Sequence, residues 1–221
     1  MNKFAQIVSL TRGTDKVLML CQYTLRLVAS FNKSQRLLNL AGPIGETRML
    51  LRYPQLILVL KDWIREMIKT KEINVLSIAM NLANVFYYPL EHVYYLGAHQ
   101  VLDIDPKLRD SIGTWSVRFW AIYVGLYFVQ LYKDKNSLDI KRAMIKSRSL
   151  DKNRDCAAKE MTEFKKEYRQ FVLNALVNVS YFPLTLHWSF PEIGLLNDLA
   201  VSVCGIAAAA GQLVSLVDEL N

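Results

Sequence analysis

The sequence predicts an all-α, membrane-associated protein, and three observations carry that prediction. Apolar residues recur with the helical period along most of the chain, whereas the alternation typical of strands is scarce. Turn signals are few and widely spaced, with 9 glycines and 6 prolines among 221 residues. Hydrophobic residues make up 52% of the chain and charged residues 21%, a balance that favours a protein partly in or on a bilayer.

The excess of positive charge points to an anionic partner. The formal net charge is +7, which suits either nucleic acid or an anionic lipid surface. The aromatic residues lie within apolar runs and do not alternate with basic residues, as they would on a nucleic-acid-binding platform. We therefore expect anionic membrane lipids as partners and no nucleic acid.

Motifs for catalysis and for cofactor binding are missing. The sequence has no P-loop, no GxGxxG or GxSxG, no HExxH and no CxxC. The three cysteines are scattered, which predicts reduced thiols and no disulfide framework: Cys21, Cys156 and Cys204. We expect no enzyme activity, no cofactor and no metal site.

The charge and hydropathy pattern divides the chain into four expected parts. These are an N-terminal amphipathic helical region (1–112), a hydrophobic helix (113–132), a charged hydrophilic insert (133–169) and C-terminal hydrophobic helices (170–221). The insert carries 12 Lys or Arg against 7 Asp or Glu, and we expect it to be helical and partly disordered.

In the N-terminal region, the first long helix is expected to start near Thr14 and to run to about Ser30. Gly-Pro and a second glycine within "LAGPIGE" (40–46) predict a turn. Pro54 then either opens the next helix or kinks one that began near Thr47.

The segment 55–71 is the clearest amphipathic pattern. A broad apolar face lies opposite a row of basic residues spaced four apart, which is the composition of a helix that lies in the headgroup layer. An amphipathic helix in a soluble bundle gives the same pattern and stays open at this point. The residues expected to bind the membrane are Leu56, Leu60, Lys61, Trp63, Ile64, Arg65, Met67, Ile68 and Lys69.

Two later segments are candidates for membrane spans. The segment 113–132 is long enough to cross a bilayer, but Arg118 lies inside it and must pair or reach the interface. The segment 199–217 carries no charge, and its small residues Ala207, Gly211 and Ser215 recur at four-residue steps, as on packing faces of membrane helices. Polar side chains interrupt the apolar runs at Asn174, Asn178 and Gln212.

"GTDKVLMLCQY" (13–23) resembles the N-terminal signature of the peroxin-eleven family of peroxisomal membrane proteins. Further segments resemble that family in the same order: "TRMLLRY" (47–53), "LEHVYYLGAHQVL" (90–102), "NALVNVSYFPLTLHWS" and "SVCGIAAAAGQL". Thr14 and Met19 stand where the family pattern has arginine. The matching motif residues are Gly13, Asp15, Lys16, Gln22, Tyr23, Arg48 and Arg52.

The resemblance implies a helical protein of the peroxisomal membrane. It implies that the protein remodels and elongates this membrane before fission and so controls the number and size of peroxisomes. It also implies self-association into homo-oligomers and contact with the fission machinery. In the family an amphipathic helix enters the outer half of the bilayer, and the segment of this chain that fits is 55–71.

Two other functions are compatible with the sequence. A membrane channel for metabolites would use the charged residues within apolar segments, Glu91, His92 and Arg118, to line an aqueous path. A soluble helical adaptor would use the same amphipathic faces to dock on other proteins.

Overall fold

The structure is a computed structural model that describes residues 3–69, 74–150 and 154–220. Within these residues the chain forms α-helices and no β-strand, as the periodicity predicts. The helices, in chain order, are α1 (Lys3–Ser9), α2 (Thr11–Asn32), α3 (Gln35–Leu51), α4 (Tyr53–Lys69), α5 (Val75–Ala98), α6 (Pro106–Leu150), α7 (Arg154–Ser189) and α8 (Asp198–Glu219).

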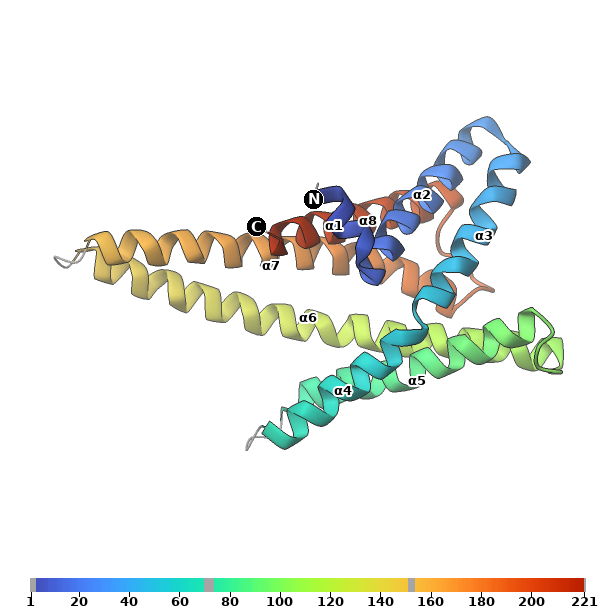
Figure 1. Cartoon of the computed structure of the whole chain (residues 1–221), viewed down its shortest axis with the longest axis horizontal. Helices are drawn as coiled ribbons and strands as arrows, with labels where there is room; N and C mark the ends of the chain where they lie inside the picture. Colours follow the sequence, from blue (N-terminus) through green and yellow to red (C-terminus); the bar gives the residue numbers. More distant parts are fainter. Residues whose placement is uncertain (1–2, 70–73, 151–153, 221) are drawn as a thin grey trace.

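The arrangement is a set of neighbouring helical hairpins (Figure 1). The pairs α5–α6 and α6–α7 have the most extensive contacts, and α2 packs on both α3 and α8. The α6–α7 hairpin is the longest element, and the end of α6 and the start of α7 extend beyond the rest of the molecule. Helix α4 leaves the end of α3 and packs along α5.

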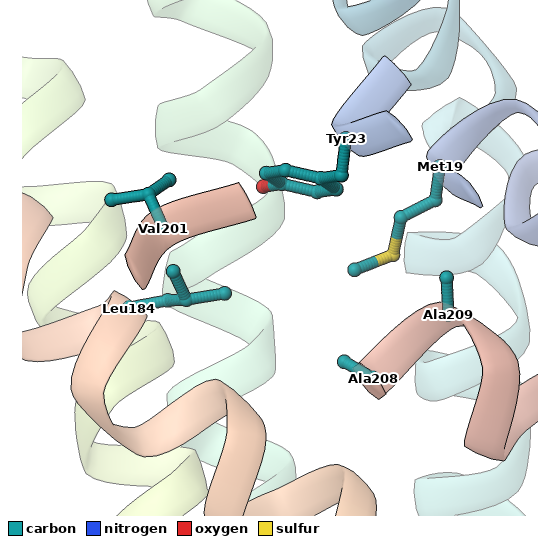
Figure 2. Close-up of a cluster of buried hydrophobic side chains, with 6 residues drawn as sticks. All are labelled: Met19, Tyr23, Leu184, Val201, Ala208 and Ala209. Carbon is teal, nitrogen blue, oxygen red and sulfur yellow. The ribbon is translucent and has the colours of Figure 1, made fainter. Parts of the chain in front are cut away.

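The best-packed core lies where α2, α7 and α8 meet (Figure 2). Met19 and Tyr23 of α2 point toward α8, and Leu184 of α7 fills the space beside them. Ala208 and Ala209 are fully buried in this cluster, because small side chains let α8 come close to its neighbours. This core is built largely from the first signature and the small-residue segment that carried the family resemblance.

Two glycines of α8 are required by close helix packing. A Cβ atom built on Gly205 would lie 2.3 Å from the Tyr23 ring, and one on Gly211 would lie 2.8 Å from the Val177 side chain. Real Cβ contacts essentially never come so close. The small-residue pattern of 199–217 therefore serves packing within this chain, on α2 and α7.

The turn expected at 40–46 is wrong. Helix α3 runs without a break from Gln35 to Leu51 and contains Pro43. Pro43 removes one backbone donor, but the helix continues because its inner face packs on α2. Gly45 serves that packing, since a Cβ there would lie 2.4 Å from the Gln22 amide nitrogen.

Helix α2 begins earlier than expected. It starts at Thr11, and Thr14 bonds the Val8 carbonyl at 2.6 Å and does not cap the helix. Pro54 lies in the first turn of α4, which was one of the two alternatives for this residue.

The segments 113–132 and 133–169 are continuous in space. Helix α6 passes through both, and α7 returns antiparallel to it. Across the distal part of this hairpin, ion pairs join Lys141 to Glu167 at 2.7 Å and Arg148 to Glu160 at 2.8 Å. Among the described residues the insert is thus a two-helix extension of the hydrophobic hairpin.

Two of the described helices are long and apolar enough to cross a bilayer, judged by length and composition: α6 over Pro106–Arg148 and α8 over Asp198–Glu219. These helices contain the two segments expected to span. Arg118 of α6 has partners within the protein, which was one of the two alternatives for this residue. Its Nε donates to the Ser189 carbonyl at 3.3 Å, and its guanidinium lies 4.9 Å from the Trp115 ring.

Candidate functional site

The surface of α4 is the first part of the candidate site. Helix α4 turns one side toward α5, and this side carries Leu56, Leu60 and Trp63, all half-buried. The Tyr53 ring stacks on His92 of α5 with ring centroids 3.8 Å apart, which fixes the first turn of α4. Three of the residues expected to bind the membrane are therefore partly covered by the protein itself.

The outer side of α4 is apolar with a basic margin. Ile57, Ile64 and Ile68 lie at helical spacing on this side and are 68%, 55% and 79% exposed. Lys61 and Arg65 are exposed beside them. The side chains of Met67 and Lys69, together with residues 70 and 71, lie outside the described part of the chain. We call the surface formed by Ile57, Lys61, Ile64, Arg65 and Ile68 the α4 outer face.

The residues expected from the sequence to bind the membrane did not include Ile57. The signal was weak, because the predicted apolar arc was broad and only the position of α5 decides which half stays open. A broad arc can be shared between a protein neighbour on one edge and an outside partner on the other.

A buried polar cluster ties α2 to α3. Arg48 of α3 donates from Nε to Asp15 at 3.0 Å and from Nη1 to Gln22 at 2.7 Å. Asp15 also pairs with Lys16 at 2.6 Å. Four residues of the family motif, far apart in the sequence, are thus joined in one network between two helices.

A second pair lies at the junction between α3 and α4. Arg52, which caps α3, donates from Nη2 to Glu91 of α5 at 2.6 Å, and the Tyr87 hydroxyl donates to the same oxygen at 2.9 Å. Glu91 and Tyr87 are both buried. Because Arg52 directly precedes α4, this ion pair sets where α4 begins relative to α5.

The two carboxylates respond to their surroundings in opposite ways. Burial alone would raise the pKa of Asp15, but Lys16 and Arg48 outweigh it, so this pKa lies below its usual value. Burial raises the pKa of Glu91 more than the Arg52 guanidinium and the Tyr87 hydroxyl lower it. Asp15 is therefore firmly ionised, whereas Glu91 is the more easily protonated of the two.

The remaining motif residues serve close packing. Gly13 lets α1 approach α2, since a Cβ there would lie 2.0 Å from the Ile7 carbonyl oxygen. Tyr23 packs on Gly205 in the core. All seven motif residues thus lie in the contacts among α1, α2, α3, α5 and α8 or in the polar clusters, and away from the α4 outer face.

The residues expected for an aqueous path each have a partner within the described part of the chain. Glu91 is paired with Arg52, His92 stacks on Tyr53, and Arg118 bonds the end of α7. The polar partner of Arg52 was missed from sequence, because Glu91 lies in an apolar segment and nothing local shows that α3 passes beside it.

The arrangement offers a surface that combines apolar and basic side chains. Among the described residues, no group of three or more His, Cys, Asp or Glu side chains could hold a metal ion. The α4 outer face combines exposed apolar side chains with cations, and the polar clusters behind it fix its position. This combination can bind an amphiphilic anionic surface.

Comparisons with known proteins agree with the resemblance seen in the sequence. The family model described as Peroxisomal biogenesis factor 11 matches residues 1–217. An uncharacterized protein of Schizosaccharomyces pombe is 25% identical over 209 residues, which cover 95% of this chain and 90% of that protein. No solved structure matches.

Proposed function

This chain belongs to the Peroxisomal biogenesis factor 11 family, and from that premise we propose that it elongates the peroxisomal membrane through the α4 outer face. Membership establishes a protein of the peroxisomal membrane with a role in peroxisome biogenesis and proliferation. The finer mechanism, a helix that enters one leaflet before fission, is the proposal. The same proposal assigns the chain a mechanical role and no catalytic one.

The observation that carries the proposal is the exposure of large apolar side chains beside cations on α4. Ile57, Ile64 and Ile68 are each more than half exposed. In water such a row is unfavourable, whereas burying one isoleucine side chain in an apolar phase stabilises by about 1.5–3 kcal/mol. A membrane surface covers this row without unfolding any other part of the chain.

The basic margin selects the kind of membrane. Lys61 and Arg65 lie beside the apolar row, where each would add roughly 1 kcal/mol near an anionic lipid surface. Helix α4 has 17 residues and so extends for ~25 Å, which lets it lie flat in the headgroup layer. A helix inserted into one leaflet expands that leaflet and favours positive curvature.

Attachment to the rest of the chain makes the helix effective. Arg52 and the stacked Tyr53 hold the first turn of α4 on α5, which in turn packs along α6. If α6 and α8 cross the bilayer, α4 is held close to its surface at a fixed place. We infer that this tethering lowers the entropy cost that a free helix would pay on binding the membrane.

Self-association and contact with fission proteins complete the proposed role. Family resemblance supports both of these partners. The exposed apolar rows on α6 and α7 leave area for a second copy or for lipid: Trp115, Ile122, Val129, Val172, Leu176 and Val179.

The experiment is a pair of charge substitutions on the α4 outer face of the full chain. Ile64→Asp with Ile68→Asp alters two side chains that are 55% and 79% exposed, so the fold is expected to persist. Losing two buried isoleucines from the membrane contact is expected to weaken binding by about a hundredfold or more. In cells, overexpression of the wild-type chain is expected to elongate peroxisomes, and the variant is expected to reach peroxisomes without elongating them.

A matched control is Val75→Asp, on an apolar side chain of α5 that is 73% exposed but does not belong to the α4 outer face. This control is expected to elongate peroxisomes as the wild type does. If the Ile64→Asp, Ile68→Asp chain elongates peroxisomes at equal abundance, the α4 outer face does not carry the membrane-elongating activity.

A further inference from the structure

A cavity with polar and apolar lining lies between α2, α6, α7 and α8, away from the α4 outer face. Its volume is about 260 Å³. It collects the polar side chains that interrupt the apolar segments of α7 and α8, namely Asn174, Asn178 and Gln212. Such residues are costly in apolar helices and usually mark a site. The structure brings them to one place.

Two of these polar side chains make hydrogen bonds between the helices that line the cavity. Asn178 is buried and donates to the Val124 carbonyl at 3.1 Å, which ties α7 to α6. Gln212 donates to the Tyr181 hydroxyl at 2.5 Å, which ties α8 to α7. These bonds hold the cavity walls in place, so the cavity is a preformed feature of the helix packing.

Other polar groups of the lining have unused hydrogen-bonding capacity. Tyr123, Tyr127 and Asn174 line the cavity, and none of their side chains makes a hydrogen bond with another described residue. Each can donate to a bound group through its hydroxyl or its amide nitrogen. Three such donors in one cavity favour a ligand with several hydrogen-bond acceptors.

The charged side chains of the lining indicate the charge of the ligand. Arg12 and Lys16 line the cavity against one carboxylate, Glu219, which pairs with Arg12. Lys16 contacts Asp15 at 2.6 Å, and its ammonium group has three donors, so two remain for a ligand. The lining therefore carries an excess of positive charge and favours an anion.

The cavity lining includes apolar as well as charged side chains. Glu219 lies at the end of α8, and Gln212 lies two turns earlier, ~10 Å along the helix. Trp120 and Val177 line the cavity as well and give it apolar wall. A lining that has basic side chains near one helix end and apolar side chains elsewhere matches a molecule with an anionic head and a hydrocarbon tail.

We propose that this cavity binds the phosphate group of a membrane phospholipid, with the first part of the acyl chains lying against Trp120. Its volume is slightly below the range of about 300–1,000 Å³ that is usual for small-molecule pockets, so it suits a headgroup and not an entire lipid. The site is separate from α4 and does not depend on the mechanism proposed above.

The test measures phospholipid binding to the full chain purified in a nonionic maltoside detergent, by native mass spectrometry. Dioleoyl phosphatidic acid is the probe, and dioleoylglycerol and inorganic phosphate are the two comparison ligands. Phosphatidic acid is expected to bind at least about tenfold more tightly than either of them, because only it joins the anion to the chains. Equal binding of dioleoylglycerol would overturn the anionic site, and equal binding of inorganic phosphate would overturn the lipid as its source.

Substitutions then locate the site. Tyr123→Phe with Tyr127→Phe removes two donors and keeps both rings, and it is expected to weaken phosphatidic acid binding by about tenfold or more. Asn174→Leu is expected to act in the same direction. Tyr132→Phe is the control, because Tyr132 lies on the same helix, is 68% exposed and does not line the cavity. Unchanged binding in the double variant, with a normal melting temperature, would overturn the proposal.

Discussion

At the scale of single residues, Arg48 is the most consequential side chain in the described structure. It is 7% exposed and bonds Asp15 and Gln22 at once, so it satisfies two polar groups of α2 from a single position on α3. A guanidinium suits this task because its donors form a planar fork, whereas an ammonium group is a point charge. Removing Arg48 leaves a buried carboxylate with Lys16 as its remaining close partner.

We predict that Arg48→Met lowers the free energy of unfolding by about 3 kcal/mol, as expected when one partner of a buried ion pair is removed. Arg48→Lys is expected to recover part of this loss, since it keeps the charge but cannot reach both partners. Thermal unfolding of the detergent-purified chain, followed by circular dichroism, measures both effects.

Arg36→Met is the control for Arg48. Arg36 lies on the same helix but is exposed, so its change is expected to stay within about 0.5 kcal/mol. Equal melting temperatures for the two methionine variants would mean that the buried cluster does not stabilise the α2–α3 contact.

At the scale of elements, the packing of α2 on α8 depends on a missing side chain. Tyr23 occupies the space that a Cβ on Gly205 would need, with a separation of 2.3 Å from the ring. Helices α2 and α8 therefore lie closer together at this point than a side chain larger than that of glycine at position 205 would allow. This contact joins the first signature of the sequence to its last hydrophobic segment.

We predict that Gly205→Ala and Gly125→Ala change stability in opposite directions. Gly205→Ala is expected to destabilise by about 1–3 kcal/mol, because the ring and the core behind it must move. Gly125 lies in α6 with nothing within 4 Å of a Cβ, so alanine there is expected to stabilise by up to about 1 kcal/mol through helix propensity.

Chemical or thermal unfolding of the two alanine variants in the same detergent measures both changes in stability. Stabilisation by Gly205→Ala, as at Gly125, would show that α2 and α8 are not in the close contact described.

At the scale of the whole molecule, the α6–α7 hairpin has two parts with different surroundings. Its proximal part packs on α5 and α8, whereas its distal part extends past them (Figure 1). The distal part is held by contacts between its own two helices, including the ion pair of Lys141 with Glu167. Arg169, nearer the bundle, pairs with Asp218 of α8 at 2.7 Å.

We predict that the distal hairpin can be removed without unfolding the bundle. Deleting residues 141–167 and joining Ile140 to Tyr168 through four Gly or Ser residues leaves the Arg169–Asp218 pair in place. Four residues reach about 13 Å when extended, enough to connect two packed helices.

The shortened chain is expected to melt within a few degrees of the full chain and to reach peroxisomes. Loss of cooperative unfolding in the shortened chain would mean that the distal hairpin stabilises the bundle.

The sequence by itself determined the helical class, the two apolar segments now found in α6 and α8, and the family. The helical class and the apolar segments depend on local periodicity and composition, which a single chain records directly, whereas the family was inferred from the resemblance of five segments in the same order. The resemblance also singled out Asp15, Gln22 and Arg48, because they match the family's motif residues. It could not say that this set is a buried cluster, since that depends on α3 lying against α2.

Only the tertiary structure decided which side of each helix stays open. Helix α5 covers Leu56 and Leu60 and leaves Ile64 and Ile68 exposed, although all four belong to one apolar arc. Packing against α2 likewise keeps α3 helical through Pro43, where local signals predict a turn. The physical reason is the same in both cases: burial against a distant segment outweighs local preference, and a sequence read locally does not show which segments meet.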